Sequence, residues 1–306
     1  PSLLFIAHRE EILGQAMNTF RHVLRDESFG DLLVGGRMPA QTRHLFCSVQ
    51  SWNARGLSQL SAEHFDYVVL DEAHHAAASS YHRILDYVRP RVLLGLTATP
   101  ERADGQDIRD DFGGRFTHEM RLVDAIEARH LVPFHYFGIG DDPDVDFSVL
   151  TWPRGGYRTE DLDRIVSTNE HRARWVLREL QDHVADLGSM RALGFCVSKL
   201  HAQFMADYFN AKGIAAEVLT AESPGASRKT VRRRLVNREI QIIFTVDLFN
   251  EGVDIPEVDT VLFLRPTESL TVFLQQLGRG LRLHDEKANL TVLDFIAPQN
   301  RRFRFA

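Results

Sequence analysis

The 306-residue sequence contains only two cysteines, no long apolar run and no excess of positive charge. Cys47 and Cys196 form neither a metal-binding spacing nor a disulfide framework, which favours a reducing cytosol. No apolar run approaches the roughly 18 residues that cross a bilayer, so we expect a cytoplasmic protein without membrane contacts. The net charge of −6 argues against binding nucleic acid by bulk charge, although local arginine clusters can still bind it.

The sequence also lacks the G-x-x-x-x-G-K-[ST] pattern with which P-loop proteins hold nucleotide phosphates. None of its four lysines follows a glycine. The first residue is Pro1, and residues 1–7 have the character of a buried strand without a leader peptide before it. We therefore expect the chain to begin inside a domain.

The composition, with 44% hydrophobic and 25% charged residues, is typical of a globular protein. Apolar runs alternate with amphipathic stretches, and this pattern predicts an α/β fold with parallel sheets and right-handed crossovers. The expected strands are 3–7, 45–49, 67–70, 92–96, 134–139, 192–197, 216–219, 240–245, 258–264 and 290–295. The expected helices are 12–24, 81–88, 171–184, 200–211, 227–237 and 270–277.

The length fits two domains of ordinary size. The alternation pauses around residues 121–133, where the first domain is expected to pass into the second. We therefore predict two tandem parallel-sheet domains, 1–132 and 133–306. No internal repeat and no low-complexity segment interrupts this organisation.

Two adjacent carboxylates follow the third predicted strand. Asp71 and Glu72 stand at its carboxyl end, where open parallel sheets bind their ligands. Such a pair suits phosphoryl transfer, because one carboxylate holds Mg²⁺ and the other orients or deprotonates the attacking water. The alternatives are a solvated helix cap and a zinc site with His74, His75 and His82, although the spacing typical of zinc ligands is absent.

Three later segments also carry polar residues next to predicted strands or on a helix. Thr97-Ala98-Thr99 follows a strand and is either a hydroxyl relay or a plain loop. Glu251-Gly252-Val253-Asp254 follows another strand, and its glycine permits a close backbone approach. The segment from Gln275 to Arg282 places two arginines three positions apart on one predicted helix face. This pair suits an arginine finger, although an ordinary exposed pair is the alternative.

Taken together, these segments resemble the ordered motifs of superfamily 2 helicases and translocases of the DEAH type. The resemblance covers nearly the whole chain. Residues 246–256, 264–269 and 293–296 look most similar to bacterial motors related to the translocating subunits of restriction enzymes. The segments similar to motifs Ia, II, III, IV, V and VI are Ala7-His8-Arg9-Glu10, Asp71-Glu72-Ala73-His74, Thr97-Ala98-Thr99, Phe195-Cys196-Val197-Ser198, Glu251-Gly252-Val253-Asp254 and Gln275 to Arg282.

The resemblance implies that ATP is hydrolysed with Mg²⁺ in the cleft between two RecA-like lobes. Asp71 would hold the Mg²⁺ ion, and Glu72 would activate the attacking water. His74 would couple to Gln275 of the second lobe. The residues that would link hydrolysis to motion are Thr97 and Thr99, and those that would lie near the nucleotide from the second lobe are Gly252, Asp254, Arg279 and Arg282.

The resemblance also implies contacts with the nucleic-acid backbone by Arg9, Gln50, Ser198 and Thr245. Many relatives have a threonine directly before the aspartate of motif V. Here Val246 takes that place and Thr245 lies one position earlier, so Thr245 departs from the family's pattern at this point.

The function that follows from the resemblance is an ATP-dependent motor on nucleic acid. Translocation on double-stranded DNA is the first expectation and strand separation the second. In this family the P-loop lies just upstream of motif Ia, so we expect a truncated first domain and an inactive chain. The strand at 92–96 would then have an unpaired edge. Some members carry a nuclease domain, and such accessory domains are possible in the parent protein.

An alternative is a nucleic-acid-binding or regulatory module that is ATPase-silent because it truly lacks the P-loop. The retention of Glu72, Arg279 and Arg282 argues against this alternative, because a silent module does not need them. A metal hydrolase built on the zinc site is a third possibility.

Overall fold

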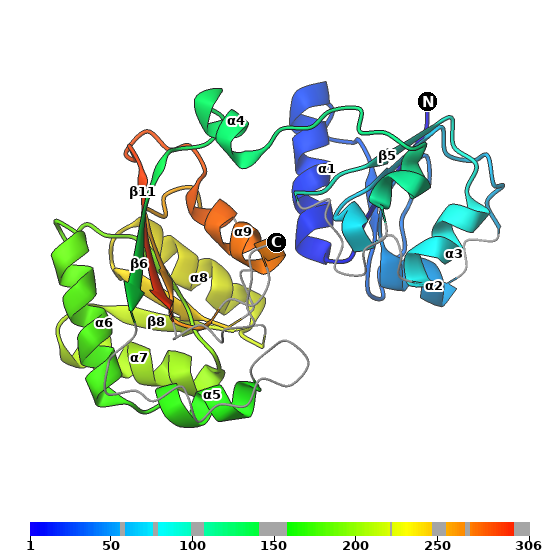
Figure 1. Cartoon of the computed structure of the whole chain (residues 1–306). Coiled ribbons are helices and arrows are strands. Elements are labelled where there is room, and N and C mark those ends of the chain that lie inside the picture. Colours follow the sequence, from blue (N-terminus) through cyan, green and yellow to red (C-terminus); the bar gives the residue numbers. More distant parts are fainter. Residues whose placement is uncertain are drawn as a thin grey trace. The chain divides into compact units, whose positions relative to one another are not determined.

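The computed structural model describes residues 1–55, 59–75, 79–98, 107–140, 158–220, 222–246, 255–266 and 270–296. The chain divides into two compact units, Pro1–Glu119 and Met120–Ala306 (Figure 1). None of the described helices combines the length and the hydropathy that a bilayer crossing requires. Of the predicted site residues, Thr99, Gly252 and Asp254 lie outside the described residues.

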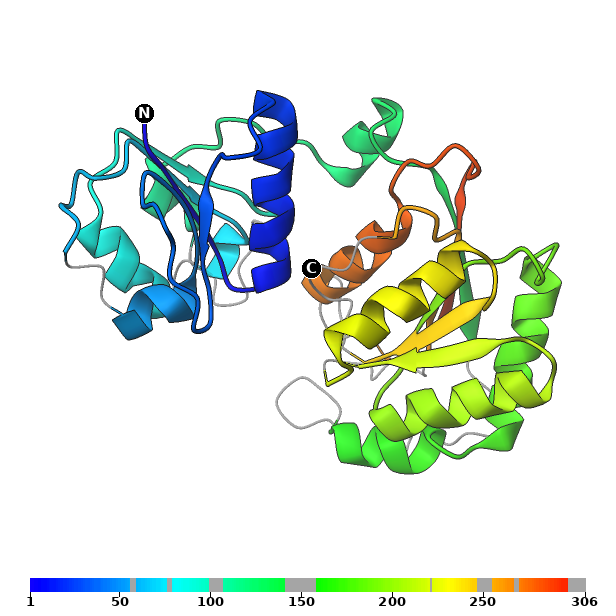
Figure 2. The same ribbon diagram turned by 180° about the vertical axis from the view of Figure 1, so that it is seen from behind.

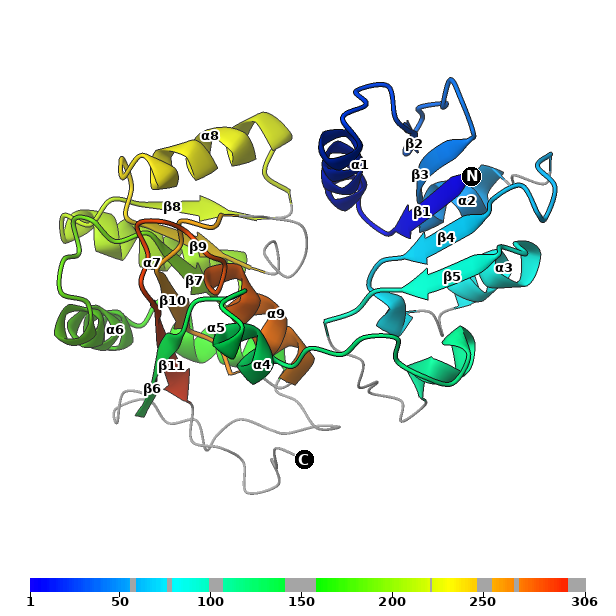
Figure 3. The same cartoon turned by 90° about the horizontal axis from the view of Figure 1, so that it is seen from above.

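Within the described residues, the first unit has one sheet of five parallel strands in the order β2-β3-β1-β4-β5 (Figure 3). The strands are β1 (Leu3–Ala7), β2 (Asp31–Leu33), β3 (His44–Ser48), β4 (Tyr67–Leu70) and β5 (Val92–Gly95). The helices are α1 (Glu10–Leu24), α2 (Val49–Arg55) and α3 (Ser79–Tyr87), with the 3₁₀ turns η1 (Ala73–His75) and η2 (Ile108–Phe112).

Strand β1 lies in the middle of this sheet, between β3 and β4, and both of its faces are buried. All five of its residues are buried, and they alternate between two apolar cores. Leu4 and Ile6 pack in the core that α2 and α3 cover, through residues such as Trp52 and Ile84. Leu3 and Phe5 pack on the other face, which α1 covers. A continuous apolar run is typical of such a doubly covered parallel strand.

Strand β5 has the free edge that the sequence predicts. In the part of the chain that the structure describes, β5 pairs with β4 alone and ends the sheet. Val92 and Leu94, on the face opposite Leu93, are 44% and 40% exposed, and Leu96 beyond the strand is 41% exposed. Apolar side chains beside an unpaired edge favour association with another strand.

The described residues of the second unit form one sheet of six parallel strands in the order β6-β11-β10-β7-β9-β8. The strands are β6 (Phe134–Gly140), β7 (Ala192–Phe195), β8 (Ala216–Leu219), β9 (Ile242–Thr245), β10 (Thr260–Phe263) and β11 (Leu290–Ile296). The helices are α4 (Leu122–Glu127), α5 (Thr159–Val166), α6 (Glu170–His183), α7 (Lys199–Ala211), α8 (Gly225–Val236) and α9 (Leu270–Gly280).

Helices cover both faces of this second sheet. On one face, α6 and α7 pack against Phe244 and Leu262 of the strands. On the other face, α8 and α9 pack against Ile243 and Phe263, and Figure 2 shows these two helices in yellow and orange. The two α/β sheets confirm the predicted fold class of tandem parallel-sheet domains.

Residues 120–132 belong to the second unit by their contacts, although the predicted boundary at 132/133 places them in the first domain. Leu131 forms an antiparallel bridge with Arg282, and the Val132 N–H donates to the Leu281 carbonyl at 2.8 Å. The Val132 side chain is buried in the core on the α8 and α9 face. This association depends on Leu281 and Arg282, which lie far along the chain, and the local sequence carries no signal for it.

A buried polar cluster joins α6, α7 and β10 in the second unit. Arg172 on α6 is 1% exposed, and its Nη2 donates to the Leu264 carbonyl at 3.0 Å. Its Nη1 lies 3.4 Å from Nε2 of His201 on α7. The Val197 N–H donates to Nδ1 of the same ring at 3.3 Å. Burial and the Arg172 charge hold the pKa of His201 well below its ordinary value, so the ring is neutral in the folded protein.

We predict that acidification destabilises the second unit through His201. The pKa of His201 is lower in the folded than in the unfolded chain, so the unfolded chain binds more protons as the pH falls below about 6.5. The contribution to stability is present above that pH and is lost below it, by up to about 1.4 kcal/mol per pH unit.

The measurement compares urea unfolding at about pH 7.5 and about pH 5.5. The wild type should lose about 1 kcal/mol more unfolding free energy on acidification than His201→Gln does. His135→Gln, which changes an exposed histidine of β6, is the matched control and should behave as the wild type. Equal losses in the wild type and His201→Gln would contradict the prediction.

Candidate functional site

The predicted motif residues of the first unit gather at one edge of its sheet. The strands are parallel, so their carboxyl ends meet there, and Ile6 is in register with Leu70 while Leu70 is in register with Gly95. The Asp71 N–H donates to the Ile6 carbonyl at 2.9 Å. The Ala73 N–H donates to the Leu96 carbonyl at 2.8 Å. The residues after β4 are therefore held between the ends of β1 and β5.

Three predicted site residues of this edge contact one another. Nδ1 of His74 lies 3.0 Å from Oγ1 of Thr97 and 3.3 Å from Oε2 of Glu72. The side chains of His74 and Glu72 are only 12% and 17% exposed. One imidazole nitrogen thus connects the Asp71-Glu72 pair with the threonine segment after β5. Nδ1 therefore hydrogen-bonds to the Thr97 hydroxyl and lies beside the Glu72 carboxylate.

The backbone at the carboxylate pair is unusual. Glu72 has a φ of 50°, in the left-handed region that residues other than glycine rarely adopt. Its N–H donates to Oδ1 of the preceding Asp71 at 3.0 Å. Left-handed backbone at Glu72 starts the 3₁₀ turn η1, on which His74 lies. The local turn therefore brings Glu72 and His74 together.

Gly95 is a residue of this site that the sequence reading missed. A Cβ atom at Gly95 would stand 2.7 Å from the Phe112 ring and 3.0 Å from Cβ of Ala73. The close packing of η1 and η2 against β5 therefore requires a glycine at this position. A glycine inside an apolar strand pattern is a signal for such close approach, and Leu94-Gly95-Leu96 carries it.

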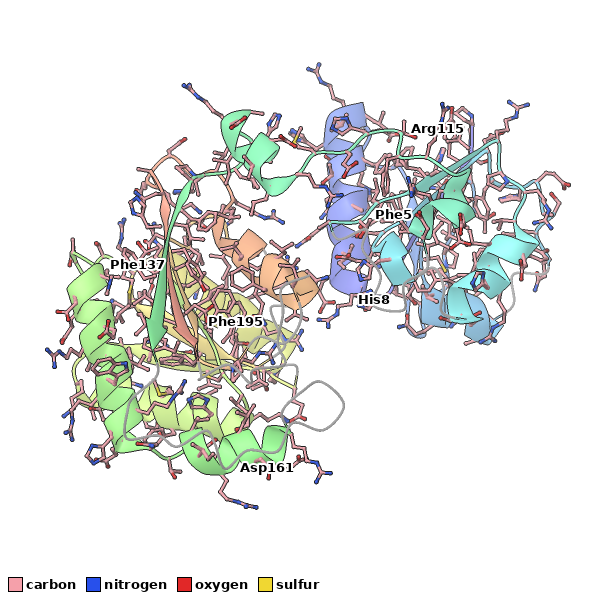
Figure 4. All side chains as sticks on the ribbon, viewed as in Figure 1. Phe5, His8, Arg115, Phe137, Asp161 and Phe195 are labelled. Carbon is pink, nitrogen blue, oxygen red and sulfur yellow. The ribbon has the colours of Figure 1, made fainter. Side chains whose placement is uncertain are left out.

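The two predicted nucleic-acid contacts of the first unit lie after neighbouring strands. Arg9 follows β1 and precedes α1, with an extended backbone and a carbonyl that accepts the Leu13 N–H at 3.3 Å. Gln50 is an exposed residue at the start of α2, directly after β3. Figure 4 labels Phe5 on β1 and His8 just beyond its end, where Arg9 follows. The structure therefore brings both residues to the edge that carries Asp71.

Ser198 of the second unit acts as the N-cap of α7. Its Oγ accepts the His201 N–H at 3.0 Å and donates to Oδ1 of Asp163 on α5. Oγ of Ser167 lies 3.4 Å away. Ser198 is half-buried. Its hydroxyl stabilises the start of α7, whether or not it also contacts a ligand.

Thr245 stands at the end of β9, in register with Phe195 of β7 and Leu219 of β8. Its side chain is fully buried, and Oγ1 has no hydrogen-bond partner among the residues that the structure describes. In this arrangement the hydroxyl does not reach the surface. The backbone carbonyl accepts the Cys196 N–H at 2.8 Å.

The predicted arginine pair is only partly on one helix. Gln275 and Arg279 lie four positions apart on α9 and share a face. The expectation that Arg282 shares this face is wrong, because α9 ends at Gly280. A Cβ at Gly280 would stand 2.5 Å from the Leu290 side chain, so the chain passes close to β11 and then pairs with Leu131. Arg282 is exposed beyond the helix.

No group of three or more histidine, cysteine or acidic residues suited to a metal ion occurs in the described parts of the chain. His75 is one of the ligands of the alternative zinc site, and its side chain lies outside the described residues. A site for Mg²⁺ needs fewer protein ligands, because this ion typically binds one or two carboxylates together with waters and substrate phosphates. The Asp71 carboxylate at the sheet edge fits that requirement.

Two family models match the chain. The model described as the res subunit of type III restriction enzymes matches residues 1–102. The model described as the helicase conserved C-terminal domain matches residues 175–284. The first match spans the Asp71-Glu72 and Thr97 segments, and the second spans Ser198, Thr245 and α9.

Known proteins are similar over almost the whole chain. A protein of Saccharomyces cerevisiae that carries the name ATP-dependent helicase IRC3 is 26% identical over 96% of this chain and 43% of its own length. The Type I restriction enzyme EcoAI endonuclease subunit of Escherichia coli is 26% identical over 96% of this chain and 39% of its own length. The chain therefore spans about half or less of these relatives.

Among solved structures, the fragment of an HsdR subunit of a type I restriction enzyme from Vibrio vulnificus has the same fold. It superposes with a TM-score of 0.70 at 22% identity, over 96% of this chain and 53% of that one. This likeness confirms the predicted pair of RecA-like units.

We predict that Ser198→Ala lowers the unfolding free energy by about 1 kcal/mol, because α7 loses its N-cap acceptor. The measurement is urea unfolding followed by circular dichroism. Ser227→Ala, which changes an exposed serine inside α8, is the matched control and should leave stability nearly unchanged. Equal stability of the two variants would show that the cap does not contribute.

Proposed function

We propose that this chain, which matches the ResIII model over residues 1–102 and the helicase C-terminal model over residues 175–284, is a restriction-motor-like helicase of superfamily 2. On this premise we propose that it is the motor part of an ATP-dependent translocase on double-stranded DNA. Membership supports an ATP-dependent helicase or translocase in general. The finer parts of the proposal are that the substrate is duplex DNA and that the motor translocates along it and does not separate its strands.

The observation that carries the proposal is the contact of His74 with Glu72 and Thr97. A motor needs a connection between the group that activates water and a segment that can move. The shared imidazole nitrogen provides such a connection between the carboxylate after β4 and the hydroxyl after β5. The proposed coupling residues are Thr97 and Thr99.

We assign ATP and Mg²⁺ as cofactors of this site. Bound Mg²⁺ supplies charge neutralisation for the phosphate oxygens in phosphoryl transfer. Asp71 would hold the ion, Glu72 would orient the attacking water, and His74 would accept or donate a proton at Nδ1. The residues proposed to serve the nucleotide from the second unit are Gly252, Asp254, Gln275, Arg279 and Arg282.

The DNA part of the proposal rests on the restriction-enzyme relative and on residues at strand ends. Arg9 and Gln50 lie at the sheet edge of the first unit, and Ser198 lies at the corresponding edge of the second. Thr245 completes the proposed set, although its hydroxyl is buried as the structure stands. Contacts to backbone phosphates give weak sequence preference and strong salt dependence.

A cytosolic location is part of the proposal and rests on the free buried cysteines.

We predict that residues 1–306 alone do not hydrolyse ATP steadily, because they contain no P-loop pattern to hold the phosphates. The measurement is phosphate release with Mg²⁺ and duplex DNA. Glu72→Gln in the same chain is the control, since an equal rate in both preparations identifies a contaminating ATPase. Steady turnover that Glu72→Gln abolishes would contradict the prediction.

We predict that duplex DNA stimulates the ATPase of the full-length gene product and that Glu72→Gln lowers kcat by about 10²–10⁴-fold. Glu63→Gln removes an exposed carboxylate of the same unit and should leave kcat unchanged. Stimulation by RNA but not by duplex DNA would refute the choice of substrate. Nucleic-acid binding without any ATP turnover would instead favour the ATPase-silent module.

A further inference from the structure

Lys287 has an unusual environment for a lysine. Its side chain is 8% exposed, whereas Lys199, Lys212 and Lys229 are exposed. Its Nζ donates to the carbonyls of Pro256 at 2.6 Å, Val258 at 2.9 Å and Gly280 at 3.0 Å. A lysine ammonium group has three donors, and here each meets a backbone oxygen. Lysine is rarely buried without such compensation.

The three carbonyls come from two segments that are distant in the sequence. Gly280 is the last residue of α9, the helix that carries Gln275 and Arg279. Pro256 and Val258 lie between the predicted motif V and strand β10. The last carbonyls of a helix lack partners within the helix, and a cation near them is favourable. The Lys287 ammonium group therefore holds the end of α9 to the segment that follows motif V.

The turn that presents Lys287 is itself anchored. The Lys287 N–H donates to the His284 carbonyl at 3.0 Å. The neighbouring Glu286 carboxylate pairs with Arg191 at 2.8 Å and with Arg238 at 3.0 Å. Arg191 precedes β7 and Arg238 follows α8, so the turn is fixed to two further parts of the unit.

A carboxylate lies within electrostatic reach of the buried ammonium group. Asp259 accepts the Arg191 N–H at 3.1 Å. Burial raises the pKa of Asp259, and the charges of Arg191 and Lys287 counter part of that rise. The positive charge of Lys287 is thus partly balanced, which lowers the cost of its burial.

We propose that Lys287 is a positioning residue, whose ammonium group fixes the end of α9, next to Arg279, to residues 256–258 and so keeps Arg279 in a constant place in the second unit. The contact itself is independent of the proposed function, but its effect on ATP turnover rests on that function. An arginine is a poor substitute, because its planar fork does not match three carbonyls that converge on one point.

The first experiment measures hydrogen–deuterium exchange in residues 1–306 for Lys287→Met and for the exposed control Lys212→Met. Methionine keeps the length and the apolar stem but removes the donors. We expect about tenfold faster exchange in residues 255–259 and 278–283 of Lys287→Met, without change in α7. Uniform loss of protection across the second unit, or no difference from Lys212→Met, would overturn the proposal.

The second experiment measures ATP turnover of the full-length gene product. We expect Lys287→Met to lower kcat about tenfold with little change in KM, because a displaced Arg279 loses contacts that strengthen in the transition state. Wild-type turnover that Lys287→Met leaves unchanged would overturn the positioning role. A wild type without turnover would refute the proposed function, and the exchange experiment would still decide whether the contact exists.

A variant that fails to fold does not end the test. In that case Lys287→Arg takes the place of Lys287→Met in both experiments, because it keeps the charge while losing the convergent geometry. Faster local hydrogen–deuterium exchange together with a lower kcat in Lys287→Arg would then support the proposal. Exchange rates and a kcat equal to those of Lys212→Met would overturn it.

Discussion

Parallel pairing of the strands is the constraint on which the candidate site depends. Because β1 pairs in parallel with β3 and β4, and β4 with β5, the residues after these strands must meet at one edge. Asp71 and Thr97 lie 26 positions apart, yet both follow strand ends that are in register. A slip of one residue would turn every side chain of a strand to the opposite face. The apolar cores on both faces therefore also fix the positions of the polar residues.

The second unit uses two buried cations to hold chain segments at the two ends of β10. Arg172 donates to the carbonyl of Leu264 just beyond β10, and Lys287 donates to carbonyls before β10 and at the end of α9. Each cation donates hydrogen bonds to backbone oxygens at the ends of elements or between them. Such groups are costly to bury and destabilise strongly when one partner is removed. Their hydrogen bonds hold loops that apolar packing alone would leave free to move.

The sequence was sufficient for short, mainly apolar runs, and insufficient for contacts between distant segments. Strands β1, β4 and β8 have the predicted bounds because apolar residues dominate them, although Tyr67 of β4 is exposed and Glu217 of β8 is half-buried. Strand β2 has only three residues, too few for a periodic pattern. The pair Asp71-Glu72 was visible because it follows a strand. Gly95, Lys287 and the bridge of Arg282 were not predicted, because their roles depend on Phe112, on three remote carbonyls and on Leu131.

The left-handed backbone of Glu72 is not explained by a helix end. Among the described residues, Arg25, Arg129 and Arg238 also have positive φ, and each lies at the end of a helix, where left-handed backbone is a common way to end it. Glu72 follows a strand, so no helix end accounts for its φ of 50°. Backbone in a sparsely populated region costs about 1–3 kcal/mol and persists where the surroundings impose it. At Glu72 the surroundings place the carboxylate beside His74, with Oε2 at 3.3 Å from Nδ1.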